Sequence, residues 1–242
     1  MRRPVEPASS CAKGSVLASL VIKICGLRSP EALDVALHAG ADMVGFVFFP
    51  PSPRHLDADA ARTLAARVKG RAQKVALSVD ATDEDLTAAI EAIQPDLLQL
   101  HGRESPKRVL EVKARFKLPV IKAIAVESRD DLAIVADYAE VADRLIFDAR
   151  APREATRPGG LGKPFDWRLL QNLDPRIPFM LSGGLDPSNV AEAVRITRPG
   201  GVDVSSGVER APGDKDPEKI RAFIRAARAA DTAGGKRMAN QA

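Results

Sequence analysis

The chain has 242 residues, 45% of them hydrophobic, which is enough to bury one sizeable core in a single domain. Its 36 Lys and Arg residues only slightly outnumber its 32 Asp and Glu residues, no basic run marks a nucleic-acid face, and one Trp and one Tyr offer little for base stacking. The sequence contains no segment typical of a signal peptide or membrane-spanning helix, and its two cysteines, Cys11 and Cys25, do not suggest a disulfide framework. We therefore expect a cytoplasmic protein with no nucleic-acid or membrane partner.

Eight short apolar runs are typical of β-strands and alternate with helix-like stretches. They span residues 21–25, 43–49, 74–79, 97–101, 120–124, 144–148, 179–182 and 202–205. Regular alternation of strand and helix indicates a parallel sheet with right-handed crossovers, and eight units favour a closed (βα)8 TIM barrel. An open doubly wound sheet is the alternative, but Gly26-Leu27-Arg28 does not supply its Gly-rich dinucleotide loop.

Turn and capping residues divide the chain further. Asp57 or Asp59 can cap the second helix, and Asp186 begins the capping segment of the seventh. The last helix is predicted to run from Pro217 through Ala229. We expect a catalytic barrel over residues 19–230, with flexible segments at 1–18 and 231–242, because both lack apolar periodicity.

Two chemically active side chains stand at the ends of predicted strands. Cys25 ends the first strand and Asp148 ends the sixth, so a closed barrel would turn both toward one small molecule as a base and an acid. Lys23 shares the face of Cys25 and is expected to favour the thiolate, lowering the pKa of Cys25 toward neutrality. The structural alternatives are a small buried Cys25 and an Asp148 that caps a helix or forms an ion pair.

The loops after the last two strands are rich in small residues. Gly183 and Gly184 follow the seventh strand, and Ser205 and Ser206 follow the eighth. In many barrels these loops bind phosphate through backbone N–H groups, because glycine lets an anion approach the backbone closely. The sequence therefore predicts a phosphorylated small-molecule substrate.

Three further polar residues are candidates for substrate contacts. Arg54 lies in a proline-stiffened loop at the barrel mouth and suits a carboxylate, or else it is a solvated surface residue. His101 ends the fourth strand, on the same face as Gln99, and is as compatible with a structural role as with substrate binding. Asp203 is either the partner of Lys23 inside the barrel, which we favour, or a substrate contact. The three scattered histidines suggest no metal site.

Taken together, these motifs resemble the phosphoribosylanthranilate isomerase family of tryptophan biosynthesis. The resemblance covers residues from about 20 to about 228 and rests on Lys23-Ile24-Cys25-Gly26-Leu27, Gly45-Phe46-Val47-Phe48, Leu98-Gln99-Leu100-His101-Gly102, Phe147-Asp148-Ala149, the segment 159–167, Leu181-Ser182-Gly183-Gly184-Leu185 and the segment 202–209. Leu161 departs from the Gly-Gly-Thr-Gly that is frequent in the family, and the segment before Val21 is longer than the family needs.

The resemblance implies an Amadori rearrangement of N-(5-phosphoribosyl)anthranilate to 1-(2-carboxyphenylamino)-1-deoxyribulose 5-phosphate. It implies Cys25 as the general base, Asp148 as the general acid, Arg54 as the partner of the anthranilate carboxylate, and no cofactor. We expect a monomer or a homodimer. A histidine-pathway isomerase would resemble a barrel with paired aspartates, which Cys25 argues against. A catalytically silent phosphosugar-binding barrel is the alternative from another class.

Overall fold

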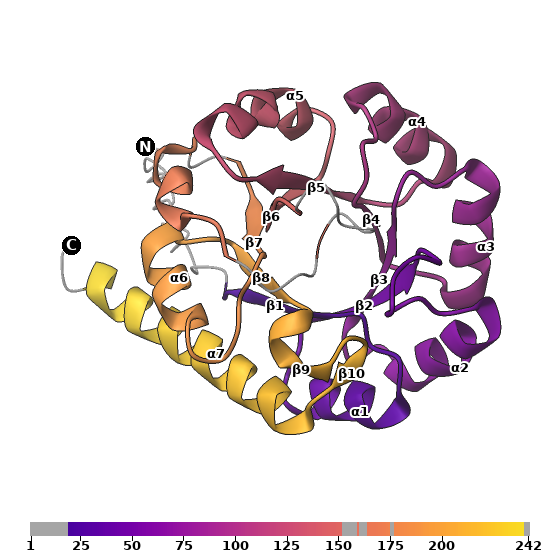
Figure 1. Cartoon of the computed structure of the whole chain (residues 1–242), viewed down its shortest axis with the longest axis horizontal. Coiled ribbons are helices and arrows are strands. Elements are labelled where there is room, and N and C mark those ends of the chain that lie inside the picture. The colour runs from indigo at the N-terminus through magenta and orange to yellow at the C-terminus, as the bar shows by residue number, and fades with distance from the viewer. Residues whose placement is uncertain (1–18, 152–158, 160–163, 175–176, 240–242) are drawn as a thin grey trace, which may run out of the picture.

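The described residues form a closed barrel of parallel strands. The computed structural model describes residues 19–151, 159, 164–174 and 177–239. The strands follow one another around the barrel in chain order, and β1 pairs with both β2 and β8 (Figure 1). They are β1 (Val21–Cys25), β2 (Met43–Phe48), β3 (Gln73–Ser78), β4 (Leu97–Leu100), β5 (Val120–Val126), β6 (Arg144–Ala149), β7 (Phe179–Leu181) and β8 (Gly201–Val204). Closure confirms the predicted (βα)8 barrel and excludes the open sheet.

The helices surround the strands, as Figure 1 shows. The α-helices are α1 (Pro30–His38), α2 (Ala58–Val68), α3 (Asp83–Ile93), α4 (Pro106–Phe116), α5 (Val135–Ala139), α6 (Val190–Thr197) and α7 (Pro217–Ala239). Three short 3-10 helices are η1 (Arg129–Ile134), η2 (Trp167–Asn172) and η3 (Ser206–Val208), and a small antiparallel hairpin pairs β9 (Glu209–Ala211) with β10 (Asp214–Lys215). Between β6 and β7 the described residues contain η2 in place of a full α-helix, so the alternation is less regular than predicted.

Local side-chain hydrogen bonds start the helices. Ser29 caps α1 by accepting from the backbone N–H of Ala32, and Asp57, not Asp59, caps α2. Before α6 the predicted cap differs, because the residue at the cap position is Asn189. Asp186 instead accepts hydrogen bonds from Ser188 and Asn189 within the preceding turn.

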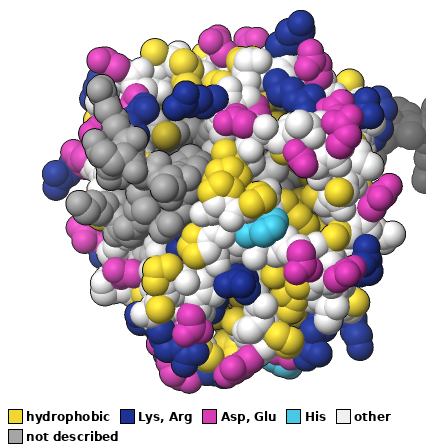
Figure 2. Space-filling view, turned by 45° about the vertical axis from the view of Figure 1, so that its right-hand side comes forward, with side chains coloured by type: hydrophobic (Ala, Val, Ile, Leu, Met, Phe, Trp, Pro, Cys, Tyr) yellow, Lys and Arg dark blue, Asp and Glu magenta, His cyan; other side chains and the backbone are white. Residues whose placement is uncertain are grey.

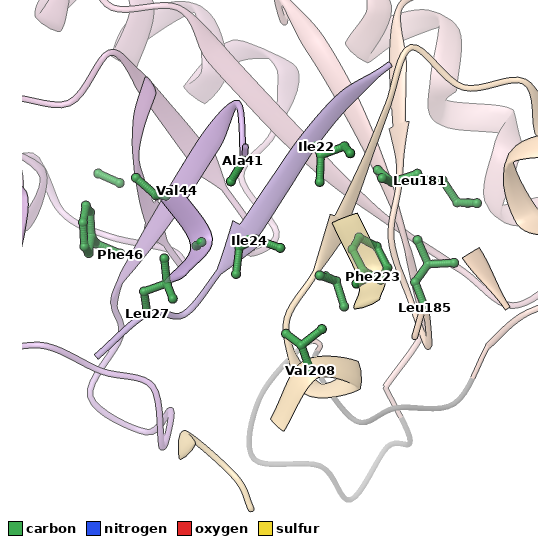
Figure 3. Packing of buried hydrophobic residues seen from close by; sticks show 14 of the residues in the cluster. Ile22, Ile24, Leu27, Ala41, Val44, Phe46, Leu181, Leu185, Val208 and Phe223 are labelled. Carbon is green, nitrogen blue, oxygen red and sulfur yellow. The ribbon is translucent and has the colours of Figure 1, made fainter. Parts of the chain in front are cut away.

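Alternate residues of β1 face the two sides of the barrel wall. Ile22 and Ile24 are fully buried between strands and helices, in a cluster with Phe46 of β2 and Phe223 of α7 (Figure 3). Burying each such side chain contributes about 1.5–3 kcal/mol. The intervening Lys23 and Cys25 therefore project into the barrel, as the two-residue period predicts. Below them, apolar residues fill the barrel interior: Met43, Val75, Leu97, Ile121, Ala123, Ile146 and Met180.

The last helix is longer than the sequence predicts. It continues to Ala239, beyond the expected end at Ala229. The expected end rested on the absence of apolar periodicity after residue 230. A tertiary contact anchors the helix near this point, where the Asp231 carboxylate accepts a hydrogen bond from the backbone N–H of Leu20 at 3.0 Å. Residues 1–18 and 240–242 lie outside the described residues, as do Cys11 and Leu161.

Candidate active site

A cleft opens at the carboxyl ends of the strands, with a volume of about 650 Å³ that includes space open to solvent. All nine predicted site residues line it: Cys25, Arg54, His101, Asp148, Gly183, Gly184, Asp203, Ser205 and Ser206. They come from β1, β6 and β8 and from the segments after β2, β4, β7 and β8. Barrel closure therefore brings together the residues that the strand ends predicted.

Cys25 lies among both charged and apolar neighbours. Lys23 is fully buried beneath it and forms an ion pair with Asp203, with 2.8 Å between Nζ and Oδ1. Burial would lower the pKa of Lys23, but Asp203 and Cys25 together outweigh it and hold this pKa above its ordinary value. The predicted contact between Lys23 and Asp203 is confirmed, and Asp203 also borders the cleft.

The predicted lowering of the Cys25 pKa is wrong in direction. Burial raises the pKa of the Cys25 thiol, and the opposing effect of Lys23 does not compensate. Asp203 adds to the increase because its carboxylate disfavours a second negative charge nearby. Sequence alone identified the neighbouring ammonium but not the degree of burial.

Small and apolar residues shape the wall beside Cys25. Gly45 pairs with Cys25 across β1 and β2, and a Cβ atom at Gly45 would lie 2.8 Å from Cys25 Sγ. Any side chain at position 45 would therefore displace the thiol or be displaced by it. Val47, Phe49 and Leu77 continue this wall along the cleft and give it an apolar surface.

Asp148, on β6, is held by hydrogen bonds. Its Oδ1 accepts from the backbone N–H of Ala149 at 2.9 Å, and its Oδ2 lies 3.1 Å from His101 Nε2. The other imidazole nitrogen, His101 Nδ1, lies 3.0 Å from the side-chain nitrogen of Gln99. Gly159 covers this pair so closely that a Cβ atom there would overlap Asp148 Oδ2. His101 is thus a partner of Asp148 as well as a residue of the cleft.

Arg54 is buried instead of solvated. Its Nε and Nη2 atoms contact the Glu209 carboxylate at 2.8 and 2.7 Å, a two-point ion pair with little exposed surface on either side chain. Its aliphatic stem crosses over Gly26, where φ is +74° and a Cβ atom would lie 2.6 Å from Arg54 Cδ. Gly26, immediately after Cys25, therefore has a left-handed backbone conformation and lies in close contact with the Arg54 side chain. Both features favour glycine at this position.

Glu209 also binds a second cation, Lys215, at 2.8 Å. Burial lowers the pKa of Lys215 to about 8, although Glu209 opposes this effect. Burial would raise the pKa of Glu209, but Arg54 and Lys215 outweigh it and leave that pKa below its usual range. The β9–β10 hairpin therefore supplies a buried carboxylate that is held ionised between two cations.

The loops after β7 and β8 meet at the cleft. Gly207 packs so tightly on Leu185 that a Cβ atom would overlap the Leu185 carbonyl oxygen. Ser205 Oγ donates to the Cys25 carbonyl at 3.1 Å, and Lys215 Nζ contacts the Ser205 carbonyl at 2.9 Å. One hydrogen-bonded set therefore joins the Ser205 loop, β1 and the hairpin.

Sequence analysis assigned no role to three buried polar residues at this site: Gln99, Glu209 and Lys215. Gln99 was detectable only as a neighbour of His101 on one strand face. Glu209 and Lys215 gave no signal, because charged residues after a strand are usually solvated and the partners of Glu209 depend on the tertiary structure.

The described residues contain neither a candidate metal site nor a candidate membrane-spanning helix. No group of three or more His, Cys, Asp and Glu side chains there is arranged to hold a metal ion. Within the same residues, no helix combines the length and apolar character needed to cross a membrane. On the face seen in Figure 2, Lys and Arg side chains are interspersed with Asp and Glu.

The fold and the cleft define a (βα)8-barrel protein with a cleft of polar and apolar residues at the carboxyl ends of its strands. The family model described as N-(5'phosphoribosyl)anthranilate (PRA) isomerase matches residues 22–226. The chain belongs to this family.

Individual relatives agree with the family match. The N-(5'-phosphoribosyl)anthranilate isomerase of Nitrobacter winogradskyi is 68% identical over 214 residues, which cover 88% of this chain and 95% of that protein. A solved phosphoribosyl anthranilate isomerase in complex with reduced 1-(o-carboxyphenylamino)-1-deoxyribulose 5-phosphate is 33% identical, with a TM-score of 0.76 and coverage of 87% and 99% of the two chains. Monomers generated from the dimeric Thermotoga maritima enzyme give 33% identity, a TM-score of 0.75 and the same coverage.

Proposed function

We propose that this barrel isomerises N-(5'-phosphoribosyl)anthranilate to 1-(2-carboxyphenylamino)-1-deoxyribulose 5-phosphate in tryptophan biosynthesis, with Asp148 as the acid and Cys25 as the base. One observation carries the pairing of these two groups: their side chains come from β6 and β1 and border a single cleft. The family membership supports the reaction, and the geometry supports the pair of groups that performs it.

The first half of the reaction opens the ribose ring. Asp148 donates a proton to the ring oxygen while the anthranilate nitrogen forms a double bond to C1, and the C1–O bond breaks to leave a protonated Schiff base. The resulting Asp148 carboxylate keeps its hydrogen bond from the Ala149 N–H and its contact with His101. These partners stabilise the charge that develops as the proton leaves.

The second half moves a proton from carbon. The Cys25 thiolate removes the proton from C2, the electron pair neutralises the Schiff base, and the enolamine then becomes the C2 ketone as C1 gains a proton. Burial leaves Cys25 with a raised pKa before substrate binds. The positive Schiff base beside Sγ favours the thiolate at the stage where a base is needed. The reaction consists of proton transfers and the cleavage of one C–O bond, with no net oxidation or reduction, so the proposal requires no cofactor.

The walls of the cleft suit the other parts of this substrate. The apolar surface of Val47, Phe49 and Leu77 fits the anthranilate ring. The loops that contain Gly183 and Gly184 and Ser205 and Ser206 suit the phosphate, and Arg54 suits the carboxylate. Asp203 acts through Lys23 and also borders the cleft. We further propose a cytoplasmic monomer or homodimer.

The test follows the fluorescence of freshly prepared phosphoribosylanthranilate, which falls as the product forms. The wild-type protein should convert it, and Cys25→Ser and Asp148→Asn should each lower kcat at least about 10²-fold, because each removes one proton-transfer group. Circular dichroism should match wild type in both variants, since the changes in volume are small. Near-normal turnover in either variant would remove that residue from the mechanism.

A further inference from the structure

Gln99 is a fully buried amide inside the barrel, on the same face of β4 as His101. Its side-chain nitrogen lies 3.0 Å from His101 Nδ1, while its side-chain oxygen has no hydrogen-bond partner among the described residues. An apolar residue of similar size would avoid an unpaired buried oxygen. The benefit of an amide at this position therefore lies in its contact with His101.

The chemistry of that contact determines where the imidazole carries its proton. An amide NH2 group can only donate, so His101 Nδ1 must accept, and in a neutral imidazole the proton then resides on Nε2. His101 Nε2 lies 3.1 Å from Asp148 Oδ2, so it donates to the carboxylate. The hydrogen bonds run in one direction, from Gln99 through His101 to Asp148.

The reversed arrangement is unfavourable once Asp148 is ionised. If the Gln99 oxygen faced His101, Nδ1 would carry the proton and Nε2 would present a lone pair to the Asp148 carboxylate. Two acceptors would then face each other in a site with little water to separate them. Gly159 closes over the same pair and leaves no room for a side chain that could intervene.

We propose that Gln99 is a positioning residue that holds His101 in its Nε2–H tautomer, so that His101 stabilises the carboxylate that Asp148 becomes after it protonates the substrate. This inference rests on the proposed function, because it assigns a purpose to the Asp148 carboxylate. Gln99 itself does not border the cleft among the described lining residues and acts only through His101.

The tautomer is measured directly by NMR on protein labelled with 15N-histidine, at about pH 8, where a free imidazole is neutral. The chain has three histidines, and His101→Asn identifies the signals of His101 by their loss. In the wild-type protein we expect a pyridine-type Nδ1 and a pyrrole-type Nε2. A protonated Nδ1 in the wild-type protein would overturn the proposal without any variant.

Two substitutions separate the tautomer effect from simple loss of packing. A carboxylate in Gln99→Glu can only accept, so Nδ1 should become pyrrole-type. Gln99→Met keeps a similar volume but neither donates nor accepts, so both tautomers should appear.

The same two variants have different expected kinetics. Loss of an outer hydrogen-bond partner typically lowers activity about 10- to 100-fold. We expect kcat to fall by this amount in Gln99→Met and further in Gln99→Glu, with KM within about threefold in both.

His38→Gln is the matched control, because His38 is exposed on α1 and is not among the residues that line the cleft. It should leave kcat and the His101 signals unchanged. A wild-type kcat in both Gln99 variants, or an unprotonated Nδ1 in Gln99→Glu, would overturn the proposal. If the wild-type protein has the expected tautomer but does not isomerise phosphoribosylanthranilate, the proposed function fails while the tautomer assignment stands.

Discussion

Cys25 is subject to two opposing influences, burial and the charge of Lys23. Burial is the larger, so the pKa of the thiol lies above its ordinary value. Asp203 weakens the effect of Lys23 further by pairing with its ammonium at 2.8 Å. Cys25, the base of the proposed reaction, is therefore a neutral thiol in the free protein. Its ionisation requires bound substrate or a higher pH.

The raised pKa of Cys25 predicts how alkylation of this thiol depends on pH. Only the thiolate reacts, so the rate should rise with pH, with a midpoint above the ordinary cysteine value of about 8.5. Iodoacetamide labelling of a Cys11→Ser variant, followed by mass spectrometry, would measure this rate, with the double Cys11→Ser, Cys25→Ser variant as background. A midpoint near pH 7 would contradict the effect of burial.

Arg54 should affect substrate binding more than turnover. Losing a charge-assisted contact to the substrate carboxylate costs roughly 1.5–3 kcal/mol, so Arg54→Ala should raise KM about ten- to a hundredfold. Arg62→Ala is the matched control, because the Arg62 side chain is 58% exposed and pairs with Asp59 on α2. Steady-state kinetics on both variants make the comparison, and an unchanged KM in Arg54→Ala would place Arg54 outside substrate recognition.

At the scale of elements, the β9–β10 hairpin supports the cleft from outside the barrel. It carries Glu209 and Lys215, and it connects through them to Arg54 and Ser205. The carboxylate of Glu209 pairs with two buried cations, Arg54 and Lys215. These ion pairs offset the free-energy cost of removing the two cations from water. The hairpin thereby adds contacts to two segments of the cleft, the loop of Arg54 and the loop of Ser205.

Lys215 makes the stability of the fold depend on pH in a defined window. Its pKa falls from 10.5 to about 8 on folding, so between these values the unfolded chain binds more protons than the folded one. Linkage then requires the free energy of unfolding to rise with pH in this window, by up to about 3 kcal/mol from this group.

Urea unfolding from pH 8 to 10.5 would test this contribution of Lys215. The wild-type curve should gain stability relative to Lys215→Met as pH rises, because the variant lacks the titrating group. Lys107→Met serves as control, since the Lys107 side chain is 87% exposed and should give a curve parallel to wild type. A difference between wild type and Lys215→Met that is constant with pH would contradict the lowered pKa.

At the scale of the whole molecule, the loops after β7 and β8 and the strand β1 meet only because the barrel closes. β1 pairs with β8, and the loops pack on each other through Gly207 and Leu185. α7 lies beside α6 and α1 and covers this part of the ring (Figure 1). Chain segments from the two ends of the sequence therefore build one site.

Inorganic phosphate should bind between the loops after β7 and β8 and compete with substrate. Ser206→Glu places a negative charge in this site, so it should raise the phosphate inhibition constant at least about tenfold. Ala66→Glu adds the same charge on the exposed side of α2 and should leave the constant unchanged. Inhibition assays over a range of substrate concentrations give both constants. Equal phosphate inhibition in Ser206→Glu and wild type would place the phosphate elsewhere.

The sequence by itself determined the barrel and the location of its chemistry. Apolar runs and capping residues are local features, and parallel strands present their carboxyl ends on one face, so Cys25 and Asp148 were predictable as facing residues. The contact of Lys23 with Asp203 followed from the same reasoning, because both side chains point into the barrel.

Tertiary structure alone decided how those residues behave. The sign of the Cys25 pKa shift depends on burial, which local pattern does not measure. The ion pair of Arg54 with Glu209 spans 155 positions, and the hydrogen bond from Leu20 to Asp231 of the last helix spans 211. Long-range contacts and burial arise only when the barrel closes, which is why chain order predicts where the site lies but not its electrostatics.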